Sequence, residues 1–265
     1  AMIHDSGGPR RVKPILERLN RSVWDKDKVV VVTDHYVPAT NAETQAIQAL
    51  TKEWVREQDI EKFYDEQGIC HVVLPERGHL SPGKFCVGGD SHSPTGGAFG
   101  AYMFGIGATE MAGVLATGTI WIKVPETILI RWHNQLSPFV TAKDMMLATC
   151  RKIGMGGGRY QAIQFAGDAV RQLGMQDRMT LSNMAAELGA QAGLIAPDET
   201  TIDYIHKAGG IVPEDWRSYQ IEAAETDDNL LSFDAAALAP QIAAPHSPAN
   251  ADDAEAFKNT RFDLA

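Results

Sequence analysis

Four short stretches of the sequence place an acid or a thiol beside an imidazole. They are His4-Asp5, Asp34-His35, Cys70-His71 and Asp90-Ser91-His92. A carboxylate next to a histidine sets the tautomer and the charge of the ring, which prepares the ring for proton transfer. Two or three such pairs in one pocket would suit a reaction in which a hydroxyl group leaves as water.

The stretch Asp90-Ser91-His92 carries the clearest signal, because it lies between glycine pairs in CVGGDSHSPTGGAFG. Glycine lets the backbone approach a ligand closely, and packing alone does not require adjacent Asp, Ser and His. The other stretches have simpler explanations as well. An Asp-His pair also occurs in turns and helix caps, and His71 can equally be a satisfied histidine of the core.

Two further polar residues, Asn183 and Glu187, are four apart in NMAAELGAQAG, so a helix would place them on one face. The remaining histidines have no partner nearby in the sequence. We interpret these four as surface or linker residues: His79, His133, His206 and His246.

Short apolar runs alternate with helical patterns along the chain. Residues 28–33 read as a buried parallel strand, and residues 41–58 have helical spacing with Asn41 or Thr40 as the cap. We predict further strands at 70–74, 84–87, 127–132 and 162–165, and further helices at 97–116, 141–152, 168–173 and 182–192. This alternation predicts an α/β fold with parallel sheets.

The fold is expected to contain two similar units. We place the first α/β unit at residues 1–125, the second at 126–235, and a linker or tail rich in Pro, Ala and Asp at 236–265. In parallel α/β sheets the carboxyl ends of the strands build the active site, so the acid–imidazole stretches are expected to converge there.

Composition limits the classes of partner. A net charge of −10 on 265 residues argues against nucleic acid as a partner. The most apolar run, residues 96–122, contains Glu110 and several glycines, so we interpret it as buried helix and expect no contact with a membrane. Three scattered cysteines without a CxxC pattern favour a reducing, cytoplasmic location.

Five sequence blocks resemble the family of aconitase and the large subunit of 3-isopropylmalate dehydratase. They are GICHVVLPERG, CVGGDSHSPTGGAFGAYMFGIGATEM, VLATGTIWIKVPETI, AKDMMLATCRKIGMGGG and MTLSNMAAELGAQAGLIAPDETT, in the family's order. The resemblance implies a three-layer α/β/α aconitase-like fold. It also implies a hydro-lyase that acts on a 2-hydroxy di- or tricarboxylic acid such as isopropylmalate or a related malate, and a place in leucine biosynthesis.

The resemblance implies a role for each polar residue. Asp34 and His35 would protonate the leaving hydroxyl, His71 with Asp90 would form a second acid–imidazole pair, and His92 with Glu187 a third. Three residues would contact the substrate or lie near the cofactor and its water. Ser91 would bind a substrate carboxylate, Asn183 would lie near the cofactor, and His4 would contact the substrate.

Members of this family use a four-iron four-sulfur cluster held by three cysteines, one in a GSCTN-type segment and two in a CxxC. Cys70, Cys86 and Cys150 do not match those positions. We therefore expect the cluster only in the complete enzyme, with ligands outside this chain, and none bound to this chain alone. The resemblance also implies two partners, a small subunit or swivelling domain that supplies the base and the cluster-binding remainder of the large subunit.

Two other hypotheses remain open. The absent cluster cysteines suit a non-catalytic scaffold, or a fragment of such a subunit. A mononuclear zinc hydrolase could use His35, His71, Asp90 and His92, but these residues lie on separate loops without an HExxH-like signature. We therefore predict no metal ligands in this chain.

Overall fold

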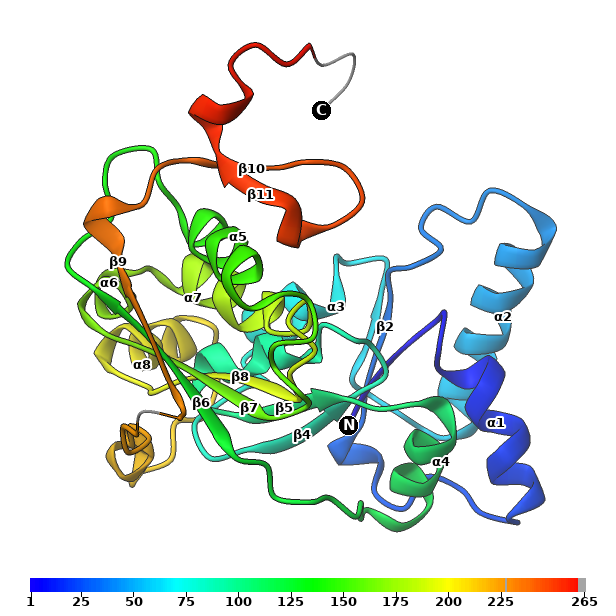
Figure 1. Ribbon diagram of the computed structural model, residues 1–265. Helices are drawn as coiled ribbons and strands as arrows, with labels where there is room; N and C mark the ends of the chain where they lie inside the picture. Colours follow the sequence, from blue (N-terminus) through cyan, green and yellow to red (C-terminus); the bar gives the residue numbers. More distant parts are fainter. Residues whose placement is uncertain (227, 262–265) are drawn as a thin grey trace.

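Helices and strands alternate through two parallel sheets and one small hairpin in the computed structural model (Figure 1), which describes residues 1–226 and 228–261. The predicted α/β class with two parallel sheets is confirmed.

The first sheet has the strand order β3–β2–β1–β4–β5, with every neighbouring pair parallel. The chain adds β2 and β3 on one side of β1 and then β4 and β5 on the other. The order therefore reverses between β1 and β4, which makes their carboxyl ends a topological switch point. The strands are β1 (Met2–His4), β2 (Val30–Thr33), β3 (Phe63–Asp65), β4 (Phe85–Gly88) and β5 (Tyr102–Gly105).

Both faces of this sheet are covered, which explains its run of consecutive valines. Val31 packs with helices α1 (Pro9–Arg18), α2 (Ala42–Glu57) and α4 (Ala108–Thr117). Val30 and Val32 point to the opposite face and pack with α3 (Cys70–Glu76), the short 3-10 helix η2 (Ser93–Phe99) and Ile205 of α8 (Glu199–Lys207). The result is the predicted three-layer α/β/α arrangement.

The second sheet has the order β8–β7–β6–β9 and is also parallel. Ile130, Trp132, Ile163 and Phe165 form one apolar face that packs on α5, α6 and α7. The elements of this unit are β6 (Thr127–His133), α5 (Ala142–Ile153), β7 (Ala162–Ala166), α6 (Asp168–Gln172), α7 (Met175–Met184), β8 (Ala192–Ile195) and β9 (Leu230–Asp234).

The helix η2 joins the two sheets. All of its residues are buried, and it packs against α7, β8 and β5. Two glycines make this packing possible. A Cβ on Gly97 would lie 1.9 Å from the carbonyl oxygen of Gly193, and a Cβ on Gly88 would lie 1.9 Å from Ser93 Oγ. A larger residue at Gly97 would therefore push η2 away from the backbone of β8, and one at Gly88 would displace the Ser93 side chain.

Three predictions of secondary structure were wrong. Residues 70–74 form helix α3 and not a strand, because the buried residues Cys70, Val73 and Leu74 follow helical spacing. Residues 97–116 are not one helix. Gly100 ends η2 with a φ of 69°, and β5 intervenes before α4.

Residues 182–192, which were predicted to be helical, are mostly not in a helix. Helix α7 begins earlier, at Met175, and ends at Met184, and turns lead from there to β8. By contrast, the strand at 28–33 and the helix at 41–58 are confirmed as β2 and α2. The Asn41 side chain caps α2 by accepting a hydrogen bond of 2.9 Å from the Thr44 N–H.

The segment expected to be a linker or tail contains the antiparallel hairpin of β10 (Gln241–Ala243) and β11 (Ala251–Asp253), beside α5 in Figure 1. Asp144 of α5 accepts a 2.7 Å hydrogen bond from the Gln241 N–H. The proposed division into two units and a tail stays a prediction. The remaining short 3-10 helices are η1 (Lys26–Lys28), η3 (Trp216–Tyr219), η4 (Ala235–Ala237), η5 (Pro248–Asn250) and η6 (Ala254–Phe257).

Among the described residues, we find no helix with both the length and the apolar character that a membrane span requires.

Candidate active site

His4 bridges the carboxyl ends of β1 and β4. Its Nε2 donates a 2.9 Å hydrogen bond to the carbonyl oxygen of Gly89, and its Nδ1 lies 3.4 Å from the Gly7 N–H. The ring is 3% exposed, and burial lowers its pKa. His4 is therefore a neutral ring whose two nitrogens are both occupied, which leaves it little capacity to bind a ligand.

Asp34 and His35 follow β2 and form a tight pair. His35 Nδ1 donates to Asp34 Oδ1 at 2.6 Å, and Asp34 Oδ2 accepts from the Cys70 N–H at 2.7 Å. Burial alone would raise the pKa of Asp34, but the hydrogen bonds from His35 and Cys70 lower it. The pKa of His35 rises to about 10, first because of Asp34 and then because of Asp90. The ring is thus an imidazolium at neutral pH.

Asp90 follows β4 and contacts two imidazoles. Its Oδ1 accepts from His71 Nε2 and from the His92 N–H, both at 2.7 Å. Its Oδ2 lies 3.5 Å from His35 Nε2. These contacts, led by those with His35 and His71, hold the pKa of Asp90 far below its usual range. Asp90, ionised at neutral pH, therefore links the loops that follow β2 and β4 to α3.

The third acid–imidazole pair crosses between the two sheets. His92 Nε2 lies 3.1 Å from Glu187 Oε1, and Ser91 Oγ lies 3.1 Å from His92 Nδ1. Asn183 makes its hydrogen bond to a hydroxyl group and not to these acids or imidazoles. Its amide donates at 3.0 Å to the hydroxyl of Thr95 in η2.

The structure thus brings the sequence-predicted residues to one edge of the first sheet. Asp34, His35, His71 and Asp90 form one chain of contacts, and the His92–Glu187 pair joins it through the His92 N–H. Ser91 is exposed beside this chain. The catalytic and substrate-binding roles of these residues stay predictions.

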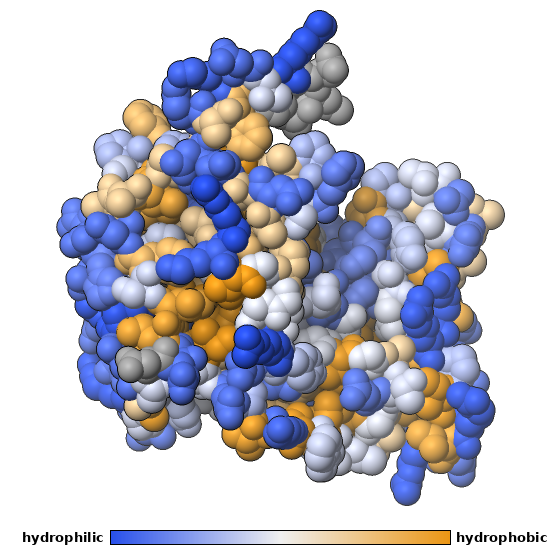
Figure 2. Space-filling model, viewed as in Figure 1, coloured by the Kyte–Doolittle hydropathy of each residue, from blue (hydrophilic) through white to orange (hydrophobic). Residues whose placement is uncertain are grey.

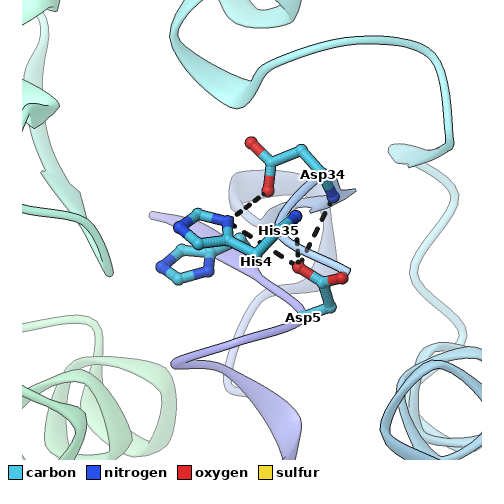
Figure 3. A group of neighbouring side chains, drawn as sticks. All are labelled: His4, Asp5, Asp34 and His35. Carbon is cyan, nitrogen blue, oxygen red and sulfur yellow. Dashed lines mark hydrogen bonds and ion pairs between the residues drawn. The ribbon is translucent and has the colours of Figure 1, made fainter. Parts of the chain in front are cut away.

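Two residues were assigned incompletely from the sequence. Asp5, which lies directly after His4, was left out of the predicted site, although it contacts the segment that carries Asp34 and His35 (Figure 3). His79 was interpreted as a surface residue without a partner, but it is half-buried and bonded to Tyr64 Oη at 2.6 Å. Burial, followed by nearby cations, lowers the pKa of His79 to about 4.

A cleft of about 380 Å³ opens beside Asp90 and Ser91. Tyr160 lines it together with Gly105 of β5 and Gln191, which precedes β8. The cleft lies where loops from both sheets meet, so a small molecule in it would contact both units.

Comparison with known proteins decides the family. The sequence profile of the Aconitase family (aconitate hydratase) matches residues 1–264.

The chain belongs to the aconitase family.

Two similar relatives are named as large subunits. The chain is 43% identical, over 94% of its length, to "3-isopropylmalate dehydratase large subunit 1" of Methanopyrus kandleri, and covers 59% of that protein. It is 40% identical, over 99% of its length, to "Probable methanogen homoaconitase large subunit" of Methanosarcina mazei, and covers 67% of that protein. The chain therefore spans roughly 60% of the length of the first of these relatives.

Aconitase-family enzymes in general bind a four-iron four-sulfur cluster, but the cysteines of this chain do not fit one. Cys70 and Cys150 are buried in different apolar cores, and Cys86 lies at the edge of the first of these. Burial raises the pKa of all three thiols, that of Cys150 to about 11. Since the thiolate is the form that binds iron, these side chains are poor ligands.

A metal site of histidines and carboxylates also fits poorly. The ligand atoms of His4, Asp5, Asp34 and His35 lie within 4.8 Å of one another. However, the His4 and His35 rings are stacked, with centroids 4.0 Å apart and planes 15° from parallel. Their nitrogen lone pairs therefore run side by side and do not converge on one ion.

Proposed function

We propose that this chain supplies the acid–imidazole half of the active site of a hydro-lyase that acts on a 2-hydroxy di- or tricarboxylic acid. The observation that carries the proposal is the position of the His35 ring between Asp34 and Asp90, with its side chain 33% exposed. A charged, partly exposed acid of this kind can protonate a departing hydroxyl group.

The two ring nitrogens of His35 have different tasks in this proposal. The Nδ1 proton is held at 2.6 Å by Asp34, whereas Nε2 has only a 3.5 Å contact with Asp90. The Nε2 proton is therefore the transferable one. When the C–O bond of the substrate breaks, its electron pair goes to oxygen, which takes this proton and leaves as water. A base outside this chain removes the proton from the neighbouring carbon, and the carbon–carbon double bond forms.

The neighbouring residues support this step. We propose that Ser91 donates its exposed hydroxyl to a substrate carboxylate, and that His71 with Asp90 and His92 with Glu187 form the second and third acid–imidazole pairs. Asn183, which holds Thr95, would fix the loop of His92. His4 is proposed to support His35 through ring stacking, because its own nitrogens are occupied.

The relatives suggest the substrate and the partners. Their names include 3-isopropylmalate dehydratase and homoaconitase, so we propose isopropylmalate or homocitrate as the substrate. The first would place the chain in leucine biosynthesis. Because the relatives are called large subunits, we propose a small subunit that supplies the base. The iron–sulfur cluster of the complete enzyme would be held by cysteines outside this chain, and this chain alone would be inactive.

The test combines this chain with a cluster-binding remainder of the large subunit and a small subunit. Iron and sulfide are restored without oxygen, and the unsaturated acid is followed by its ultraviolet absorbance, with isopropylmalate and homocitrate in separate reactions. Turnover of either substrate supports the proposal. Absence of turnover in an assembly whose cluster is demonstrably loaded contradicts it.

The second candidate is a non-catalytic scaffold, which the poor fit of the cysteines to a cluster favours. The same assembly distinguishes the two. If a His35→Asn variant of this chain turns over substrate as fast as the natural sequence, the chain contributes structure and not chemistry.

A further inference from the structure

Asp5 is a fully buried carboxylate, with 0% of its surface exposed. Among the described residues, no lysine or arginine lies within ion-pair distance of it. The His35 ring lies 3.8 Å away but is already bonded to Asp34, so burial of the Asp5 carboxylate is unfavourable unless hydrogen bonds compensate for the lost water. The question is which donors do so.

The donors are backbone N–H groups of one short segment. Asp5 Oδ1 accepts from Asp34 at 3.4 Å and from His35 at 3.1 Å, and Oδ2 accepts from Tyr36 at 3.1 Å. The Ser6 N–H adds a further contact at 3.1 Å. Three successive N–H groups around one anion form a nest, which fixes the backbone of that segment. Figure 3 shows Asp5 beneath Asp34 and His35 in this arrangement.

The segment in the nest is the one that carries the His35 ring. Asp5 Oδ1 lies 3.8 Å from His35 Nδ1, so its charge also favours the imidazolium. The preceding residue, His4, stacks against the same ring at 4.0 Å. From the opposite side, Gln48 of α2 donates to the Tyr36 carbonyl oxygen at 2.8 Å. The end of β1 thus fixes both the backbone and the ring of His35.

We propose that Asp5 is a positioning residue: it holds residues 34–36 so that the His35 ring stays between Asp34 and Asp90. Asp5 acts through His35 and does not touch the substrate. Its role in turnover rests on the proposed function, whereas its hold on His35 can be measured in this chain alone.

The principal test is Asp5→Asn. Asparagine offers one acceptor oxygen and turns an amide nitrogen toward backbone N–H groups, so it cannot satisfy the nest. By NMR of this chain, we expect the downfield Nδ1 proton resonance of His35 to be lost or to shift, and the pKa of His35 to fall. In the loaded assembly, we expect kcat to fall by about 10- to 100-fold, as for other residues that orient a reacting group, with little change in KM.

Thr33→Val is the matched control. Thr33 is also 0% exposed and ends β2, but its hydroxyl donates to Asp65 at 2.8 Å and accepts from the Glu66 N–H at 2.8 Å. This change removes buried hydrogen bonds next to the same loop without touching the nest. The His35 resonance and pKa should stay at the values of the natural sequence.

Two outcomes would overturn the proposal. One is an unchanged His35 resonance in Asp5→Asn, and the other is an equal shift in Thr33→Val. If Asp5→Asn does not fold, amide hydrogen exchange of the natural chain decides, because the Asp34, His35 and Tyr36 amides should be protected like those of a strand. Fast exchange there refutes the nest. If the resonance shifts as expected but no assembly turns over, the proposed function fails and the positioning role stands.

Discussion

The two parallel sheets each place an ionic group near the carboxyl ends of their strands, but the groups differ in kind. In the first sheet, the cation is His35, which lies between Asp34 and Asp90 and is 33% exposed. In the second, it is Arg178, which is 1% exposed and binds both oxygens of Asp198 at 2.7 Å. A guanidinium does not give up its proton, whereas an imidazolium can.

The hydrogen-bond partners of Arg178 and His35 differ as well. Arg178 also donates to the carbonyl oxygens of Leu173 and Arg171, so all three nitrogens of its guanidinium group are hydrogen-bonded within the protein. Asp198 caps α8 by accepting from the Thr201 N–H. His35 instead keeps its Nε2 in a long contact and partly open. A pair whose donors are all bonded within the protein stabilises the fold, whereas a pair that keeps one N–H partly open retains a proton that can be transferred.

Removal of His35 should give the largest effect. We expect His35→Asn to reduce turnover in the loaded assembly by about 100- to 10,000-fold, the usual contribution of a positioned acid. The midpoint of thermal unfolding at neutral pH should fall by less than after removal of Arg178, because the His35 ring is partly exposed and solvent screens its ion pairs. The measurements are initial rates and a thermal melt of the same variant. A large loss of stability with intact turnover per folded molecule would show that His35 stabilises the fold and does not take part in the chemistry.

Removal of Arg178 should mainly lower the stability of the fold. Arg178→Met leaves Asp198 without its cation and should lower the free energy of unfolding by about 3 kcal/mol, as for other broken buried pairs. Urea unfolding measures this. The NMR resonances of His35 should stay in place in molecules that remain folded. If they move, the second sheet also sets the geometry of the first site.

Dependence on pH sharpens the contrast. The folded pKa of His35 is about 10, against an ordinary value of 6.5. Its stabilisation is therefore complete below pH 6.5 and lost as the pH rises toward 10. The pKa of Asp90 is lowered, so its contribution is present above its ordinary value of 3.8 and lost in acid. Urea unfolding between pH 6.5 and 10 should show a decline that His35→Asn reduces and Arg178→Met retains. Equal declines in all three proteins would contradict the assignment.

The smallest effect is expected at a helix cap that lies outside both ionic groups. Asn41→Ala removes the side-chain acceptor for the Thr44 N–H at the start of α2 and should lower the free energy of unfolding by about 1 kcal/mol. The control is Glu43→Gln in the same turn, which keeps the cap. A change in the His35 resonance in Asn41→Ala would show that α2 also sets the loop of residues 34–36.

The sequence predicted the elements whose signals are local. The valines of β2 and the cap of α2 were readable because each depends on adjacent residues. Residues 70–74 were misread because a short β-branched run fits a strand as well as a helix, and the contacts of Cys70 and Val73 with the sheet decide. Strand β5 was missed because its apolar residues continue into the small residues of α4.

In the candidate site, too, contacts between residues far apart in the sequence could not be predicted from local signals. The contact of His71 with Asp90 and that of His92 with Glu187 were expected only through the family resemblance, since their partners are 19 and 95 residues away. Asp5 went unassigned because its partners are backbone N–H groups, which leave no mark in a sequence. The distance of Asp5 from His35 along the chain, 30 residues, is closed only by the pairing of β1 with β2.

The buried helix η2 lies between the two sheets, and Gly97 allows it to approach the second sheet closely. Since η2 begins directly after His92 and rests on the second sheet, a small tilt of one sheet against the other would change the 3.1 Å contact of His92 with Glu187. The length of that contact would therefore report the relative orientation of the two sheets on either side of the cleft.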